Sequence, residues 1–518
     1  MGYLDGQILF ALIFALILAW IGGLIVARWY SSRLLSFMQI GSAPVDESAI
    51  DRSETFLAQV KPEQPTQSLF SQNKQALWRY RVTIISISFI LALVIAFFVQ
   101  NAYEFDSFSL TRTALLALAY AWPLVLCLGL LERWPRWRIL WLSLLYMAVV
   151  NVLVMLNSNE AQSLAEVMIW LFGQQLPPLV FIFILTSPGI RSVGPYLLFV
   201  FILLVGSSLV GYEILALSLA DGSAESWITD LVEMSNAYVV FILFGVVPWL
   251  IAFFPLRSLA RKMAHLYRLK YFSETLYLIA GVWLIVLLFQ AMVLSHSVLG
   301  LSAYMLLISW FIIPIGFFVL RPFLTPDHHP PTLLLLRVFR SDDSIGKLFD
   351  KVLEYWRYSG NTVMIAGKDL ALRTLEPDEL FSFLNGQLRS RFVSDKSRLQ
   401  QGIEELDFKP DPDGRFRVNE FFCFDSTWKM VLETLVVKAE LVFMDLRAYT
   451  SERKGCSYEL EVLASSPHLQ KIIILFNDQT DKETAHHLLG DRAKGVVWVE
   501  ESSDQGKMEL RVLTALLD

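Results

Sequence analysis

The chain has 518 residues, which is too long for one ordinary domain. Hydrophobic residues make up 55% of it and charged residues 18%, a balance that indicates membrane-spanning segments and not a wholly soluble protein. The formal net charge of -6 argues against nucleic-acid binding carried by bulk charge, so we expect no nucleic-acid partner.

The chain holds three cysteines, Cys127, Cys423 and Cys456. Cys127 lies in an apolar run, and none of the three has the CxxC spacing of a zinc site. We therefore expect no disulfide framework, no metal site, and a reducing compartment around the soluble part.

Residues 8 to 322 contain repeated apolar runs of about 18–25 residues, which is long enough to cross the hydrocarbon core of a bilayer. The nine predicted spans are 8–27, 82–100, 113–131, 139–156, 166–187, 195–218, 237–256, 276–294 and 301–320. The first run has no basic stretch before it, so we expect it to remain as an anchor and not to be cleaved as a signal peptide.

Charge placement supports this count. With the N-terminus outside, the inner loops 28–81, 132–138, 188–194 and 257–275 carry sixteen Lys and Arg, whereas the outer segments carry one. Positive charge is retained on the cytoplasmic side of membranes. The sequence thus predicts an integral plasma (inner) membrane protein whose partner is the lipid bilayer and whose C-terminal domain is cytoplasmic.

Two features of the membrane region have more than one interpretation. "GQQLPP" (173–178) interrupts a predicted span, and broken helices line sites in transporters. No acid with a basic partner lies clearly at mid-membrane, however, so helix packing is favoured over transport. The basic stretch 255–274 could lie on an anionic membrane surface, dock against the soluble domain, or simply hold retention charges.

The composition changes after Arg321. We predict a transmembrane domain at 1–324, a Pro-rich linker at 325–331 and an α/β domain at 332–518. The predicted strands are 332–339, 361–367, 440–446, 471–477 and 495–500, and the predicted helices are 344–360, 426–439, 456–466 and 507–517. Strands buried on both faces that alternate with helices indicate a parallel sheet.

Three pieces of this domain carry a resemblance. "RVFRS" (337–341) ends the first strand, Trp428 opens a helix, and "LVFMDLRAY" leads to "GCSYEL" (455–460). In this order they resemble the Toll/interleukin-1 receptor (TIR) family, which implies a TIR/flavodoxin-like fold. The whole arrangement is similar to bacterial membrane proteins that end in a TIR-like domain.

The chain departs from the family pattern at three places. Gly455 stands where the family usually has Trp, and Arg337 replaces the usual opening Asp. About 55 residues, 370–425, lie where TIR domains have a short segment. Within them we expect "FRVNEFFC" (416–423) to cover an edge of the sheet, with lining of a pocket as the alternative.

Glu459 is the candidate catalytic residue. Ligands of open parallel sheets bind beyond the carboxyl ends of the strands, and the segment after strand 440–446 lies there. The resemblance implies that Glu459 matches the Glu with which some TIR domains cleave NAD, by stabilising an oxocarbenium-like transition state. The alternative is an exposed first-turn carboxylate that is favoured only by the helix dipole.

The candidate nucleotide-binding residues lie on the same edge: Arg340, Ser341, Asp445, Arg447 and Cys456. For Cys456 we expect a pKa lowered by the helix N-terminus, with a small packing residue as the alternative to a nucleophile.

The sequence therefore predicts a bacterial membrane-anchored signalling or defence effector whose cytoplasmic TIR-like domain recognises or cleaves a nucleotide such as NAD, with NAD as substrate and not as a resident cofactor. Whether it is an enzyme stays open. The alternatives are a non-enzymatic TIR-like module that forms a homo-oligomer and controls a membrane pore, and a transporter with a regulatory tail.

Overall fold

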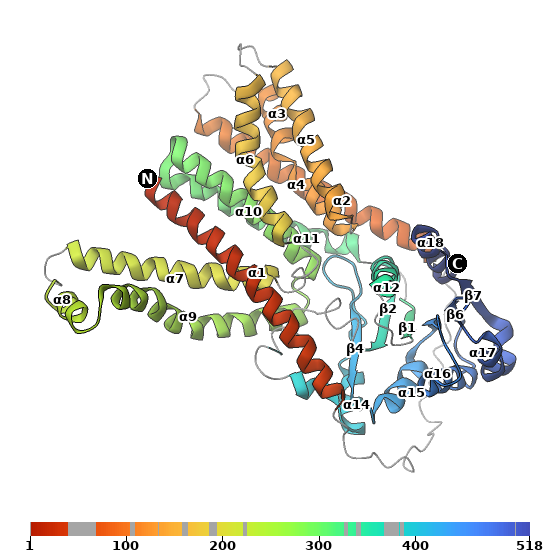
Figure 1. Ribbon diagram of the computed structural model, residues 1–518. Helices are drawn as coiled ribbons and strands as arrows, with labels where there is room; N and C mark the ends of the chain where they lie inside the picture. Colours follow the sequence, from red (N-terminus) through yellow and green to blue (C-terminus); the bar gives the residue numbers. More distant parts are fainter. Residues whose placement is uncertain are drawn as a thin grey trace. The chain divides into compact units, whose positions relative to one another are not determined.

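The computed structural model describes residues 2–39, 69–103, 109–132, 134–157, 164–185, 194–220, 225–325, 330–337, 343–366, 383, 388–502 and 504–517. These residues belong to two compact units. The first unit comprises the described residues within 1–28 and 82–319, and the second comprises those within 29–81, 320–366 and 383–517 (Figure 1).

The first unit consists of helices. They are α1 (Gly2–Gln39), α2 (Leu69–Ala102), α3 (Leu110–Tyr120), α4 (Pro123–Leu131), α5 (Arg136–Leu156), α6 (Leu164–Leu185), α7 (Gly194–Ala220), α8 (Glu225–Met234), α9 (Ala237–Arg268), α10 (Glu274–Leu294), the π-helical turn η3 (Ser295–Leu299), the 3-10 helix η4 (Gly300–Phe311) and α11 (Ile312–Leu324). The end of α1, the start of α2 and the end of α11 belong to the second unit. Residues 29–39 and 69–81, expected in an inner loop, are continuations of α1 and α2.

Among the described residues, six helices are long and apolar enough to cross a membrane. They are Phe10–Met38, Leu69–Ala102, Arg136–Leu156, Ala237–Arg268, Glu274–Leu294 and Ser297–Leu324. The pair α3 and α4, bent by 42°, raises the number to seven if it is one span. The described part of the chain therefore offers fewer spans than the nine expected from the sequence.

The difference arises in three of the expected segments. Run 113–131 is broken into α3 and α4 just before Pro123, which cannot donate a backbone hydrogen bond. In α6 and α7 the apolar stretches that can be described, Gln175–Ile184 and Val200–Ala216, are parts of longer helices of 22 and 27 residues. Hydropathy alone does not detect the break between α3 and α4.

Helices α7 and α9 pack against each other through small residues (Figure 1). A Cβ atom added at Gly211 would lie 2.1 Å from the carbonyl oxygen of Phe244, so only glycine permits this approach. Ser208 Oγ donates to the carbonyl oxygen of Gly245 at 2.8 Å and accepts a hydrogen bond from Trp249 Nε1 at 2.5 Å. These contacts hold α9 along much of its apolar half.

The second unit contains a parallel sheet, which has seven strands in the part of the chain that the structure describes. The strands are β1 (Thr332–Arg337), β2 (Asn361–Ile365), β3 (Phe392–Val393), β4 (Val418–Cys423), β5 (Leu441–Asp445), β6 (Lys471–Phe476) and β7 (Val496–Glu500). Their order is β3-β4-β2-β1-β5-β6-β7. Without β3 and β4, this is the 2-1-3-4-5 order of a doubly wound sheet, whose direction of winding changes between β1 and β5.

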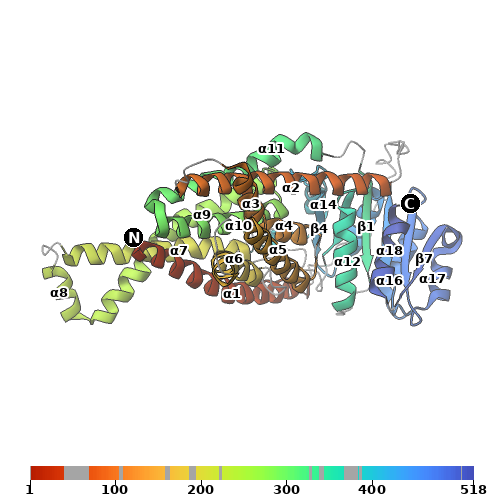
Figure 2. The same ribbon diagram turned by 90° about the horizontal axis from the view of Figure 1, so that it is seen from above.

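Alternate residues of each strand pack on opposite faces of the sheet, as expected for strands buried on both sides. Leu334 and Met444 join one core, and Leu335 and Phe443 join the other. The first core is covered by α14 (Lys396–Glu404), α15 (Trp428–Lys438), α16 (Lys454–Ala464) and α17 (Lys482–Leu489), and the second by α12 (Asp343–Trp356) and α18 (Gln505–Leu517). Figures 1 and 2 show α12 and α18 side by side.

The parallel α/β architecture confirms the sequence prediction, and the five predicted strands correspond to β1, β2, β5, β6 and β7. Strands β3 and β4 and helices α14 and α17 were not predicted. Residues 416–423 were expected to cover an edge of the sheet. They include β4, which pairs with β2 on one side and with β3 on the other.

Two helix ends pack within the second unit against this domain. At the start of α2, Asn73 Nδ2 donates to Ser359 Oγ at 2.9 Å, and Leu69 packs against the core beneath α12 and α18. At the end of α11, the carbonyl oxygen of Leu324 lies against Gly414, where an added Cβ would be 2.3 Å from it. Gly414 also has a φ of +79°, so both the backbone conformation and the close packing of this turn require glycine.

Candidate ligand site at the carboxyl ends of β1 and β5

The candidate site lies where the strand order reverses. Strands β1 and β5 are neighbours, and their final residues, Arg337 and Asp445, are partners in the parallel register. Crevices at such switch points are the usual ligand sites of open α/β sheets. Arg340 and Ser341, which were expected to contribute from the end of β1, lie outside the described residues.

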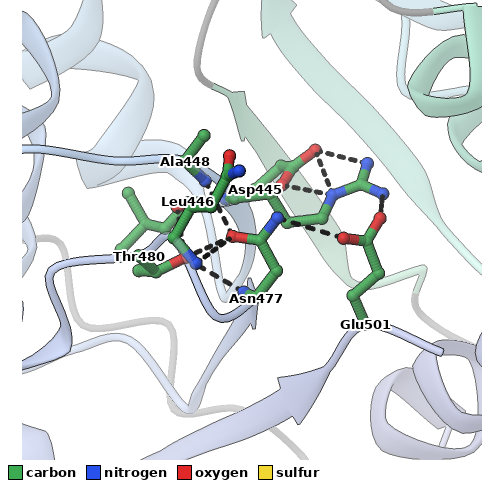
Figure 3. Close-up of polar contacts among 8 residues, drawn as sticks. Asp445, Leu446, Ala448, Asn477, Thr480 and Glu501 are labelled. Carbon is green, nitrogen blue, oxygen red and sulfur yellow. Dashed lines mark hydrogen bonds and ion pairs between the residues drawn. The ribbon is translucent and has the colours of Figure 1, made fainter.

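Asp445 and Arg447 lie together and form an ion pair with each other. Asp445 Oδ1 accepts hydrogen bonds from the backbone N and the Nε of Arg447, both at 3.0 Å, and Asp445 Oδ2 accepts one from Nη2 at 2.8 Å. Arg447 Nη1 also donates to Glu501 Oε1 (Figure 3). Burial alone would lower the pKa of Arg447, but the hydrogen bonds and charges of Asp445 and Glu501 outweigh it and raise the pKa.

A second set of hydrogen bonds ties the loop after β5 to the loops after β6 and β7. Asn477 Oδ1 accepts from the backbone N of Ala448 at 3.0 Å, and Asn477 Nδ2 donates to Glu501 Oε2 at 3.1 Å (Figure 3). Thr480 Oγ1 donates to the carbonyl oxygen of Leu446 at 3.0 Å. The backbone of Ala448, with a φ of 55°, is held in a left-handed conformation by these contacts.

Glu459 is buried, with 7% of its surface exposed, in contrast to the alternative of an exposed first-turn carboxylate. Because α16 begins at Lys454, two residues earlier than expected, Glu459 lies in the second turn and not in the first. Leu460 and Leu463 are the other buried residues of α16, and Leu463 is one turn beyond Glu459 on the same face. The helix dipole at the N-terminus therefore does not explain this side chain.

The carboxyl group of Glu459 has an unusual environment. Its Oε2 atom is buried and has no hydrogen-bond partner among the residues that the structure describes. Burial raises the pKa of Glu459 to about 8, because the charged form loses its solvation. At pH 7 this side chain is therefore mostly a neutral acid, able to donate a hydrogen bond or a proton.

Cys456 is half-buried on α16, one turn before Glu459. Burial, together with the charge of Glu459, raises the pKa of its thiol to about 12, although Arg453 acts in the opposite direction. The expected lowering by the helix N-terminus was therefore wrong, because desolvation outweighs the dipole at this position. Cys456 fits the alternative of a small packing residue.

Sequence reasoning missed Asn477, Thr480 and Glu501. Asn477 directly follows β6 and Glu501 directly follows β7, whereas Asp445 is the last residue of β5, so the same rule of strand carboxyl ends would have found them. In the described ranges, no group of three or more His, Cys, Asp or Glu side chains is arranged to hold a metal ion.

The fold and the site together define an integral membrane protein that carries a parallel α/β domain with a polar cluster at its switch point. Comparison of the chain with protein-family models, curated proteins and solved structures found no match.

Proposed function

We propose that this chain is a membrane-anchored signalling or defence effector whose TIR-like, flavodoxin-like domain binds or cleaves a nucleotide such as NAD in the bacterial cytoplasm. The observation that supports this proposal is Glu459. It is a buried carboxyl group with one oxygen lacking a hydrogen-bond partner in the described part of the chain, and it follows the strand at the switch point. Buried acids with shifted pKa values in such positions are typical of functional sites.

The raised pKa gives Glu459 two forms with different uses. The neutral acid would donate a hydrogen bond to a ribose hydroxyl. A bound nicotinamide cation would favour the ionised form, because an opposite charge nearby lowers a carboxyl pKa. The resulting carboxylate would stabilise the positive charge that develops as the glycosidic bond breaks.

The proposal is tested with the full-length chain reconstituted in lipid vesicles at low and at high protein density. NAD is added, and released nicotinamide and NAD binding are both measured. We expect binding, and turnover at one density or both. Neither binding nor turnover at either density would contradict the proposal.

A second candidate function is a non-enzymatic module that self-associates and controls a membrane pore. It is supported by the pairing of Asp445 with Arg447, because these two polar side chains bind each other. Chemical cross-linking of the vesicle-bound chain separates the two functions. Density-dependent oligomers combined with vesicle leakage, and without NAD turnover, would favour this module.

We also propose nine membrane crossings, with the N-terminus outside, in which the bent pair α3–α4, α6 and α7 supply the three spans beyond the six long helices. The sixteen-to-one distribution of Lys and Arg supports this topology. A reporter that is active only in the cytoplasm should be active when fused after residue 518 and inactive when fused at residue 158. Activity at residue 158 would contradict it.

A further inference from the structure

The last three turns of α9 carry a concentration of positive charge that neither proposed function uses. Arg257, Arg261, Lys262 and Arg268 are all exposed. The sequence contains no Asp or Glu between Met234 and Ser273. Within the part of the chain that the structure covers, none of these four side chains forms an ion pair.

The three arginines are arranged on one face of the helix, and Lys262 lies to the side of it. Arg257, Arg261 and Arg268, with exposed His265 between them, follow i, i+4, i+8 and i+11 spacing, which places them in one stripe. The opposite face holds Leu259, Met263 and Tyr267, which are half-buried or buried. The stretch is therefore an amphipathic helix whose cationic side is open.

The stretch is held as helix up to its end. Two hydrogen bonds close its last turn: Lys270 N donates to the carbonyl oxygen of Tyr267 at 3.0 Å, and Tyr271 N donates to that of Leu266 at 3.1 Å. Lys270 takes a left-handed conformation with a φ of 61°, which completes this Schellman-type ending. The cations are therefore displayed in fixed spacing and not on a loose tail.

The stretch begins where the apolar part of α9 ends. Residues 237–256 contain no charged side chain and, at a rise of about 1.5 Å per residue, span about 30 Å. Phe253 and Phe254, which precede the first cation by four and three residues, are 55% and 73% exposed, as expected of side chains that face lipid tails. If these residues fill the hydrocarbon core, Arg257 lies at the level of the lipid headgroups.

We propose that the exposed cationic face formed by Arg257, Arg261 and Arg268, with Lys262 at its side, binds the headgroups of acidic phospholipids. Each Lys or Arg close to an anionic lipid surface raises the affinity of the protein for that surface about fivefold. A stripe of fixed cations beside a lipid-facing apolar segment matches the phosphates of such headgroups in charge and depth. The other candidate occupant, an acidic surface of the chain's own α/β domain, is distinguished by the test.

The test uses the purified full-length chain in mixed micelles of phosphatidylglycerol and phosphatidylcholine in equal amounts, with retained lipids counted by native mass spectrometry. We expect the wild-type chain to retain phosphatidylglycerol preferentially. The triple variant Arg257→Gln, Arg261→Gln, Arg268→Gln should lower this preference more than fivefold, and the matched Lys triple, which keeps the charge, should retain it. A control triple in the α/β domain, Lys438→Gln, Lys494→Gln, Lys507→Gln, should leave it unchanged.

Three results would overturn the proposal. The Gln triple could retain the wild-type lipid preference. The Lys triple could lose as much of the preference for phosphatidylglycerol as the Gln triple, which would mean that the shape of the Arg side chains and not their charge is required. Finally, the Gln triple could abolish a cross-link between α9 and the α/β domain while lipid retention stays constant, which would make that domain the occupant.

Discussion

Glu459 lies one helical turn beyond Cys456 on α16, and its carboxyl group adds to the burial that raises the pKa of the Cys456 thiol to about 12. Both groups are therefore mostly uncharged at pH 7. Asp445 is paired with Arg447, which also binds Glu501. The domain thus has a neutral carboxyl group on α16 and an ion-pair cluster at the end of β5, and this arrangement leads to specific predictions.

Glu459 should make the folded domain less stable as the pH rises. Its pKa is about 8 when folded against the ordinary 4.5, so between these values the unfolded chain releases a proton that the folded chain keeps. The contribution is fully present below pH 4.5 and is lost as the pH approaches 8, at about 1.4 kcal/mol per pKa unit and therefore on the order of a few kcal/mol. Glu459→Gln should remove this slope.

The measurement is chemical denaturation of the full-length chain in detergent at pH 5 and pH 8, followed by a probe of the α/β domain. Glu461→Gln is the matched control, because Glu461 is exposed on the same helix and should keep the wild-type slope. Equal slopes for wild type and Glu459→Gln would show that Glu459 is ionised in the folded state.

Cys456 should react slowly with thiol reagents at pH 8, because only the thiolate attacks and the raised pKa leaves little of it. Glu459→Gln should speed alkylation, since it removes a negative charge one turn away. Peptide mass spectrometry after timed exposure to iodoacetamide measures the modification of Cys456 itself. Fast alkylation of the wild-type chain under folded conditions would contradict this account.

The two ion pairs of Arg447 should contribute very differently to stability. Asp445→Asn leaves a buried guanidinium without its main partner, and we expect a loss of about 3 kcal/mol or more in the free energy of unfolding. The side chain of Glu501 is 35% exposed, so Glu501→Gln should cost about 1 kcal/mol or less. Comparable losses would mean that Glu501 holds Arg447 as strongly as Asp445 does, which would contradict this account.

Gly414→Ala should destabilise the second unit. The residue has a φ of +79°, and a new Cβ would lie 2.3 Å from the carbonyl oxygen of Leu324, so backbone must move. We expect a loss of about 1–3 kcal/mol in the free energy of unfolding. Gly495→Ala is the control, since nothing lies within 4 Å of a Cβ there. An equal and small effect of both substitutions would contradict the close packing of the α11 end.

The sequence predicted the strands well because a strand buried on both faces is a continuous apolar run, as in "LLLL" of β1 and "IIIL" of β6. It did not predict β4, where Asn419 and Glu420 interrupt the apolar pattern. It also misjudged Glu459, because α16 begins two residues earlier than expected, which puts Glu459 in the second turn and not in the first. Which face of the helix is buried depends on tertiary packing, which the local sequence does not fix.

The candidate site, like the fold, was predicted in part from the sequence. The rule that ligands bind at strand carboxyl ends pointed to Asp445 and Arg447, which lie at the end of β5, but it could not reveal that these two side chains bind each other. That pairing depends on how the loop after β5 folds back, with Ala448 in a left-handed conformation that composition does not indicate. The environment of Cys456 was predicted with the wrong sign for a related reason, since burial is a tertiary property.

The central claim is that Glu459 acts on a nucleotide, and paired substitution tests it most directly. Release of nicotinamide from NAD is measured for the full-length chain in vesicles with Glu459→Gln and with Glu461→Gln, at equal protein amounts and across pH 6–9. The account predicts that Glu459→Gln lowers the rate about a hundredfold or more, as for other lost electrostatic stabilisers, whereas Glu461→Gln keeps it. Equal rates for the two variants at every pH would contradict the claim.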